Sequence, residues 1–277
     1  MLKPVVWLVS LASSISAHAA SPVPPSAYQK SLETIQFKGE SEGPAQQVAR
    51  LAFAQCNLFR QQYGVAELWP DPALLAGVDT RQIERFYADG MARTLVKGYT
   101  LAATDLQRWL NESKATPGSL PKTAPDCSVA SKQPIVTDSL WRDGTLYHID
   151  HHAKRVRQQQ RAASLLPTEL LTPAQLSALP KHEVLSHACV QVSQAELPLP
   201  ARAALGFVAP SGGTLSSCLW QAVPLQAYLN FPWPLESVVE TNMAGKTLLQ
   251  RQQSIELNTG VALPAETFAL PVGYQKK

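Results

Sequence analysis

Residues 136–150 read VTDSLWRDGTLYHID, and this stretch decides the architecture of the C-terminal half of the chain. Residues 136–142 and 145–150 are each typical of a β-strand, with the dipeptide Asp143-Gly144 between them. Asp-Gly is favoured in a two-residue type I′ turn because both positions require positive φ angles. The stretch therefore predicts an antiparallel hairpin, and we expect a third strand through residues 155–157.

More strands are expected downstream of this hairpin. They cover residues 183–192, 214–220, 237–243 and 246–257. A short helix is expected to begin at Thr172, an N-cap residue followed by Pro173. Residues 263–274 place apolar side chains between prolines, which predicts an extended tail clamped onto a sheet by Phe268 and Tyr274.

The N-terminal half shows a different spacing of apolar residues. Between Pro44 and Gly64 they recur every three or four residues, at Val48, Ala52, Cys56, Phe59 and Tyr63. A repeat of four follows Asp79 or Thr80 at Ile83, Tyr87, Met91 and Leu95, and a third short helix is expected after Thr104. These spacings predict a mainly helical N-terminal half and an α+β fold, with a curved antiparallel sheet in the C-terminal half.

The predicted organisation has five parts. They are a signal peptide over residues 1–19, an extended leader over 20–43, a helical region over 44–112, a linker over 113–134 and a β-rich domain over 135–277.

The first residues carry the signature of a secretory signal peptide. Lys3 precedes an apolar stretch over residues 5–15, and Ala17-His18-Ala19 supplies a small-residue cleavage site. We expect cleavage after Ala19 and a mature protein in the periplasm or outside the cell. The apolar stretch falls well short of the roughly 20 residues that span a bilayer, so no transmembrane segment is expected.

Four cysteines in an exported chain, with no C-x-x-C pair, indicate structural disulfides. Three pairings are possible. We favour Cys56 with Cys127 and Cys189 with Cys218, because each pair then stays within one half of the chain.

Composition and motifs narrow the function classes. A formal net charge of +3 is too small to imply nucleic acid as a partner. The G-x-S-x-G nucleophile elbow, the P-loop and the G-x-G-x-x-G fingerprint are missing, which disfavours an enzyme, and no cofactor is expected. The oligomeric state is left open.

Two stretches together resemble the LolA-like half-barrel group, the bacterial envelope proteins of the lipoprotein-carrier type and the secreted families related to them. One is residues 141–150 with Lys154, Arg155 and Val156, and the other is residues 256–274. The resemblance covers about Val136 to Tyr274. It implies a curved antiparallel sheet that encloses an apolar cavity, a fold that serves lipid binding, envelope sensing or protein contact, and so does not fix the activity.

Two groups of side chains are candidate sites. If residues 147–153 form a strand, His148, Asp150 and His152 share one face, and these are possible zinc ligands. A solvated outer face is the alternative interpretation. Tyr228, Phe231 and Trp233 are candidates for contact with an apolar ligand, and packing at a sheet corner is their alternative.

The leading hypothesis is a non-enzymatic, soluble envelope protein that binds an apolar ligand, such as a lipid or a lipoprotein, or an envelope protein partner. The second hypothesis is a structural or assembly component of an envelope or secretion complex. The third is a zinc-dependent hydrolase built on the histidine cluster.

Overall fold

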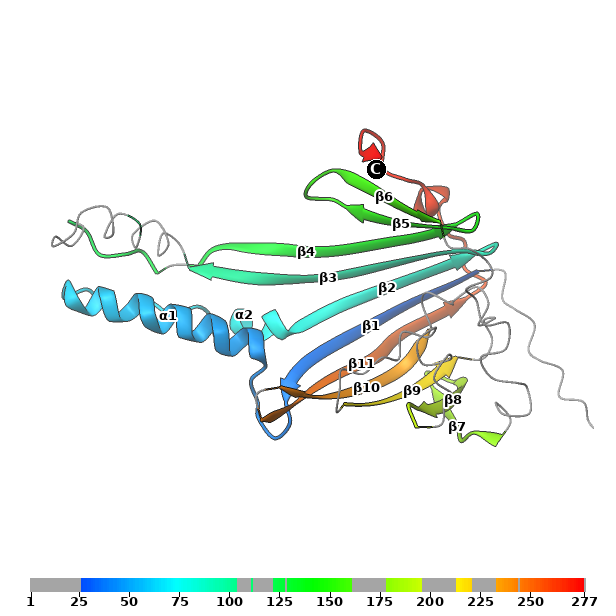
Figure 1. Ribbon diagram of the computed structural model, residues 1–277, viewed down its shortest axis with the longest axis horizontal. Helices are drawn as coiled ribbons and strands as arrows, with labels where there is room; N and C mark the ends of the chain where they lie inside the picture. The colour runs from blue at the N-terminus through cyan, green and yellow to red at the C-terminus, as the bar shows by residue number, and fades with distance from the viewer. Residues whose placement is uncertain are drawn as a thin grey trace, which may run out of the picture.

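Twelve strands form one sheet in the computed structural model, which describes residues 26–103, 111, 122–127, 129–160, 178–195, 213–220, 233–243 and 245–276 (Figure 1). The strand order is β12-β6-β5-β4-β3-β2-β1-β11-β10-β9-β8-β7. All neighbours are antiparallel except the two residues by which β12 pairs with β6.

The strands run along most of the described chain. Their bounds are β1 Ser26–Phe37, β2 Thr80–Ala88, β3 Met91–Ala103, β4 Val129–Arg142, β5 Thr145–Asp150, β6 Arg155–Gln160, β7 Lys181–Val184, β8 His187–Ser193, β9 Thr214–Trp220, β10 Pro234–Met243, β11 Lys246–Thr259 and β12 Gln275–Lys276. The α-helices described in full are α1 (Pro44–Gln62) and α2 (Pro72–Ala76), and the 3-10 turns are η1 (Gly77–Asp79) and η4 (Ala265–Phe268).

The expected mainly helical N-terminal half is wrong. The residues assigned to a second helix, from Thr80 to Gly98, form the hairpin of β2 and β3. A repeat of four residues fits a helix, but it also fits a strand, in which every second residue shares a face. The dipeptide Asp89-Gly90 turns this hairpin with φ angles of 49° and 78°, the same chemistry as the turn at residues 143–144.

Other segments also depart from the expected division of the chain. Residues 26–37 of the expected leader form β1, between β2 and β11 in the sheet. The start of β4 includes residues 129–134 of the expected linker. The single strand expected over residues 183–192 is a hairpin of β7 and β8, because Leu185 and Ser186 adopt positive φ angles. The signal peptide expected over residues 1–19, and most of the helices expected after Thr104 and at Thr172, lie outside the described residues.

The hairpin predicted at residues 136–150 is present as β4 and β5, and β6 follows as the third strand. Asp143 and Gly144 have φ angles of 53° and 73°, as a type I′ turn requires.

The sheet has two faces, which we name after an arginine on each, the buried Arg85 and the partly buried Arg93. The Arg85 face carries a core cluster that joins β2 to β8 through Tyr87, Ala27, Leu235, Trp220 and Cys189. These strands span six positions in the sheet, so the sheet must curl for their side chains to form one cluster, and Figure 1 shows this curvature.

The tail, residues 261–276, covers the part of the Arg93 face formed by β3 to β6. Phe268 of η4 is buried in a cluster with Leu140, Ile149 and Val156, and Tyr274 packs against it. The tail therefore covers apolar side chains that the single-layered sheet would leave in water.

A buried ionic network holds the tail in place. The side chain of Asp138 is fully buried and accepts two hydrogen bonds from Arg93, at 2.9 and 2.6 Å. Nε2 of His151 lies 2.8 Å from the same carboxylate. Arg93 also donates to the carbonyl of Thr267, and Arg142 donates to the carbonyl of Phe268, so the network bonds directly to the tail backbone.

Two disulfides are present. Cys56 of α1 is bonded to Cys127, just before β4, and Cys189 of β8 is bonded to Cys218 of β9. These are the pairs favoured in the sequence. They fit a protein of an oxidising compartment, the periplasm or the cell exterior. Within the described residues, no helix has both the length and the apolar character to span a membrane.

Helix α1 projects beyond the ends of the strands (Figure 1). Asp79 caps its N-terminus from a distant part of the chain, accepting hydrogen bonds from the backbone N–H groups of Ala45 and Gln46 at 3.0 and 2.8 Å. Gly43 precedes the helix, and a Cβ there would collide with Asp79 and with the carbonyl of Ile35. The start of α1 is thus fixed to the sheet end.

Replacing Asp79 by alanine removes both capping bonds and is expected to lower the free energy of unfolding by about 1–2 kcal/mol. Urea denaturation with intact disulfides measures this. The exposed Glu236 serves as the control position, because Glu236→Ala removes a carboxylate without removing a cap. Equal effects of the two substitutions would contradict the capping role.

Candidate functional site

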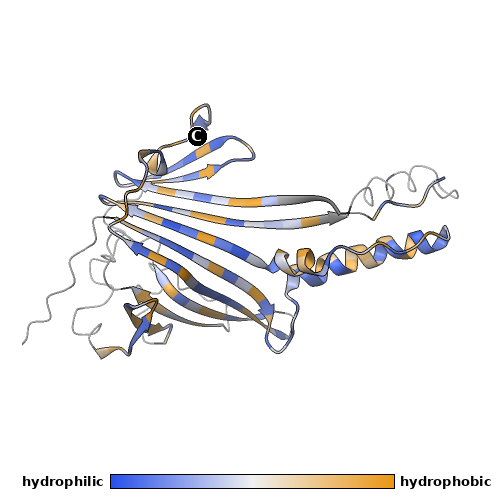
Figure 2. Cartoon of the chain, turned by 180° about the vertical axis from the view of Figure 1, so that it is seen from behind, coloured by the Kyte–Doolittle hydropathy of each residue, from blue (hydrophilic) through white to orange (hydrophobic). Residues whose placement is uncertain are grey.

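Helix α1 has apolar residues on two opposite sides. One side is buried against the protein and contains Ala49, Phe53 and Cys56. On the opposite side, large apolar side chains remain in contact with solvent: Val48 is 66% exposed, Leu51 70% and Leu58 60%. Figure 2 shows hydrophobic and hydrophilic residues alternating around the helix. A buried core therefore accounts for only one of its two apolar sides.

The exposed side follows a heptad spacing. Val48, Leu51, Gln55, Leu58 and Gln62 are separated by three, four, three and four residues, and all five are exposed. At about 100° per residue they lie within a stripe roughly 80° wide. This is the a/d spacing by which one helix packs against another in a coiled coil. We call these five residues the α1 seam.

The positions beside the seam carry no charge. They are Gln47, Ala52, Ala54, Phe59 and Gln61. Charged residues at such positions usually select the partner and the orientation in coiled coils. The α1 seam and the positions beside it are therefore uncharged.

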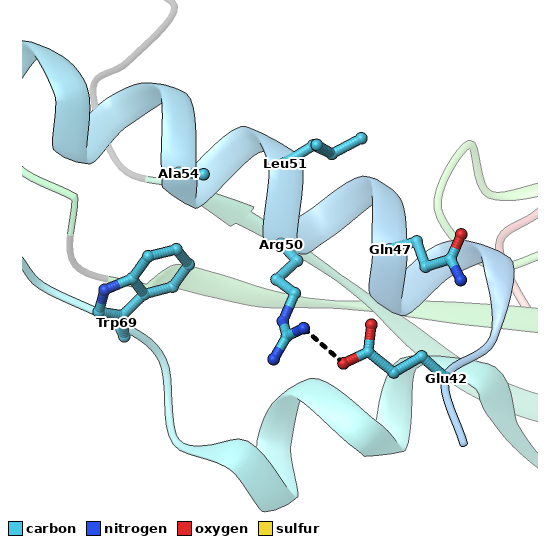
Figure 3. Close-up of a pocket in the computed structure, with 6 residues that line it drawn as sticks. All are labelled: Glu42, Gln47, Arg50, Leu51, Ala54 and Trp69. Atoms are coloured by element: carbon cyan, nitrogen blue, oxygen red, sulfur yellow. Dashed lines mark ion pairs between the residues drawn. The ribbon is translucent and has the colours of Figure 1, made fainter. Parts of the chain in front are cut away.

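A pocket of about 510 Å³ opens along one edge of the seam, lined by Glu42, Gln47, Arg50, Leu51, Ala54 and Trp69 (Figure 3). Arg50 Nη1 lies 2.7 Å from Glu42 Oε1, so the two charges neutralise each other at one end. Figure 3 places the Trp69 ring beside the helix near Ala54 and Arg50. Trp69 is 47% exposed and supplies an aromatic wall.

The wall that carries Trp69 is fixed to α1 by hydrogen bonds. The buried side chain of Asn57 accepts from the backbone N–H of Leu68 at 2.8 Å and donates to its carbonyl at 3.1 Å. Arg60 donates to the carbonyls of Ala66 and Pro125. The pocket is therefore a preformed feature of the fold.

Sequence reasoning missed the seam. It placed Val48 on the core face of this helix, whereas Val48 is the first residue of the exposed stripe. A signal was present in the sequence, because Val48, Leu51 and Leu58 recur with their own helical spacing. They lie on a different side of the helix from Phe53 and Cys56, so one buried stripe cannot include them all.

The structure does not bring the candidate zinc ligands together. His148 contacts Ser139 Oγ at 3.4 Å, while Asp150 accepts from the backbone N–H of Ala153 and lies 3.9 Å from Arg155. The hydrogen bond from Ala153 lowers the pKa of Asp150 below its usual range. His152 is exposed, and among the described residues no group of three His, Cys, Asp or Glu side chains could hold a metal.

His151, between these candidates, is the histidine that joins the buried network of Asp138. Its ring also lies 3.1 Å from the hydroxyl of Tyr274. A second pocket of about 570 Å³ adjoins it, lined by Pro134, Val136, Asp150, His151 and His152. In this part of the molecule, polar contacts therefore serve to attach the tail.

Of the three candidate aromatic residues, the structure describes Trp233. Trp233 is 3% exposed, and its ring lies 5.8 Å from that of Trp220 in the core cluster of the Arg85 face. Tyr228 and Phe231 lie outside the described residues.

The described residues define a curved, disulfide-linked β-sheet protein with an exposed apolar helix. No protein-family model matches the chain. No curated protein matches its sequence.

Solved structures resemble the chain over most of its length, at low identity. An uncharacterized conserved protein from Thermus thermophilus is 8% identical, with 92% of this chain and 91% of that chain covered and a TM-score of 0.38. The complex of MucA and MucB from Pseudomonas aeruginosa gives 13% identity, 90% and 57% coverage and a TM-score of 0.32. A DUF1329 family protein from Desulfovibrio piger gives 9% identity, 89% and 90% coverage and a TM-score of 0.27. These TM-scores lie below 0.5, so the likenesses carry no argument about function.

Replacing Asn57 by alanine is expected to free the backbone around Leu68, because both hydrogen bonds to that residue are lost. Hydrogen exchange of the Leu68 amide should accelerate about fivefold or more, as expected for the loss of a part-buried hydrogen bond worth about 1 kcal/mol. Gln55→Ala, which removes an exposed amide from the same helix, is the control and should leave this amide protected. Unchanged protection in Asn57→Ala would contradict the proposed support of the pocket wall.

Proposed function

We propose that this chain is a non-enzymatic envelope protein that binds a protein partner through the α1 seam. The observation that carries the proposal is the exposure of Val48, Leu51 and Leu58 on one side of a helix whose other side is already buried. Large apolar patches on a folded surface mark interaction sites, because water contact is unfavourable for them.

The proposed occupant is an amphipathic helix of the partner. The heptad spacing of the seam matches the spacing of apolar residues on such a helix. The neutral flanking positions neither repel nor select charges on it, and the paired charges of Arg50 and Glu42 leave the adjoining pocket close to neutral. The pocket beside Trp69 offers room for one large side chain of the partner.

The resemblance of residues 136–274 to LolA-like envelope proteins supports a role in the envelope, as do the two disulfides. A structural or assembly role would use the same seam. The zinc-dependent hydrolase has no support from the described residues, in which no metal-ligand group assembles.

An apolar ligand is the second candidate function. The observation that favours it is the aromatic cluster on the curled Arg85 face, in which Trp220, Trp233 and Tyr87 lie together. These buried residues would form one apolar wall of such a site, and apolar walls with a few polar groups are usual in sites for apolar molecules.

Photo-crosslinking in cells that export the protein tests the α1 seam. A photoreactive side chain at Leu58 is expected to give a discrete adduct with one other protein, and the cross-linked residue should map to a heptad-patterned helix of that protein. Leu51→Glu is expected to reduce the adduct at least about tenfold, because a charge in the centre of an apolar contact must be desolvated.

Two controls make the test specific. The same photoreactive side chain at Val272, which is 98% exposed on the tail, should give no such adduct. Ile255→Glu changes an exposed apolar residue of β11 and should leave the Leu58 adduct intact. Equal labelling from Val272, an adduct within the same chain or an adduct with a second copy would each overturn the proposed partner helix.

A further inference from the structure

Arg85 lies in β2 on the inside of the curled sheet and is 8% exposed. Its Nη1 donates to Gln29 Oε1 at 3.0 Å, and its Nη2 donates to Gln252 Oε1 at a longer 3.3 Å. Its Nε is buried without a hydrogen-bond partner. The guanidinium therefore touches two neutral amides and no carboxylate.

The negative charge of Glu33 acts on Arg85, but the side chain of Glu33 contacts other residues. Glu33 accepts a hydrogen bond from Gln250 at 2.6 Å and lies 3.5 Å from Arg81. Burial lowers the pKa of Arg85 to about 10, and the charge of Glu33 partly offsets this effect. Arg85 is therefore still a cation at neutral pH, and its charge is buried without a direct counterion, which is an unfavourable arrangement.

The weakly bonded atoms lie on one edge of the guanidinium. Nε and Nη2 form the side-on edge, and this edge carries one unpartnered N–H and one long bond. Carboxylates and phosphates bind arginine through two parallel hydrogen bonds to such an edge. This edge of Arg85 therefore matches the geometry of an oxyanion.

Strand pairing places Arg85 in a row of polar residues that crosses the sheet. Successive cross-strand neighbours are Gln29, Arg85, Thr94, Ser139, His148 and Arg157. The first four are buried and the last two are exposed, and the row contains no acidic residue. At about 4.8 Å per strand, Arg157 lies roughly 19 Å from Arg85, so the row links the buried cation to the surface.

An apolar row runs beside the polar one, two residues further along each strand. Its cross-strand neighbours are Ala27, Tyr87, Ala92, Trp141 and Leu146. Tyr87 and Ala27 also belong to the aromatic cluster of the Arg85 face. A molecule on this face would meet a cation on one side and apolar surface on the other.

We propose that Arg85 anchors the acidic headgroup of an amphiphile, a carboxylate or a phosphate, whose apolar chain lies along the row that contains Tyr87. This inference rests on the second candidate function and gives its ligand a chemical class. The polar row offers hydrogen bonds along the path between the surface at Arg157 and the site at Arg85.

Binding of palmitate and of its uncharged methyl ester to the purified full chain with intact disulfides tests the proposal. The two probes have the same acyl chain, so only the headgroup differs. Titration followed by tryptophan fluorescence should give at least tenfold tighter binding of palmitate. Arg85→Gln should lower the affinity for palmitate to that for the ester. Arg251→Gln, at an exposed arginine of β11, should leave the affinity for palmitate unchanged.

The possible outcomes distinguish failure of the headgroup site from failure of the apolar-ligand function. Equal binding of acid and ester would overturn the headgroup site and leave the apolar-ligand function standing, and this comparison needs no variant. Binding of neither probe would overturn both. Displacement of palmitate by millimolar inorganic phosphate would identify a site for a free anion and overturn the amphiphile. Unchanged palmitate affinity in a folded Arg85→Gln protein would remove Arg85 as the anchor.

Discussion

The strands form one layer, and a single layer has two faces to remove from water. The chain does this in two ways. On the Arg85 face the sheet curls until strands five positions apart share one aromatic cluster. On the Arg93 face the tail lies over the strands and is bonded to them by Arg93 and Arg142. The curvature, the buried network of Asp138 and the position of the tail all follow from the absence of a second layer in the described residues.

Local chemistry predicted those parts of the fold that depend on a few consecutive residues. Asp143-Gly144 identified its hairpin because the dipeptide itself sets the turn. The same signal was present at Asp89-Gly90 but was outweighed by an apolar repeat of four, which a strand satisfies as well as a helix. The anchoring of the tail by Phe268 was also readable, although Ala265–Phe268 form the 3-10 turn η4 and not the extended segment that was expected.

The candidate sites were less accessible to sequence reasoning, for two physical reasons. The α1 seam was hidden because a helix with two apolar sides gives no indication of which side is buried, and Phe53 and Leu51 look equivalent in the sequence. Arg85 was hidden because its neighbours come from three other strands. Gln29, Gln252 and Thr94 are placed beside it only by the register of the pairing, which depends on the whole sheet.

The disulfide between Cys56 and Cys127 also makes the rigidity of the α1 seam depend on redox conditions. It joins the buried side of α1 to the segment before β4, next to the turn of helix that presents Leu58. In a reducing compartment the thiols stay separate, and the far half of α1 is then held by packing and by the hydrogen bonds of Asn57, Arg60 and Gln61. The rigid form of the seam is thus completed only where oxidation occurs. The rigidity of this exposed apolar surface therefore depends on a bond that lies on the buried side of the helix.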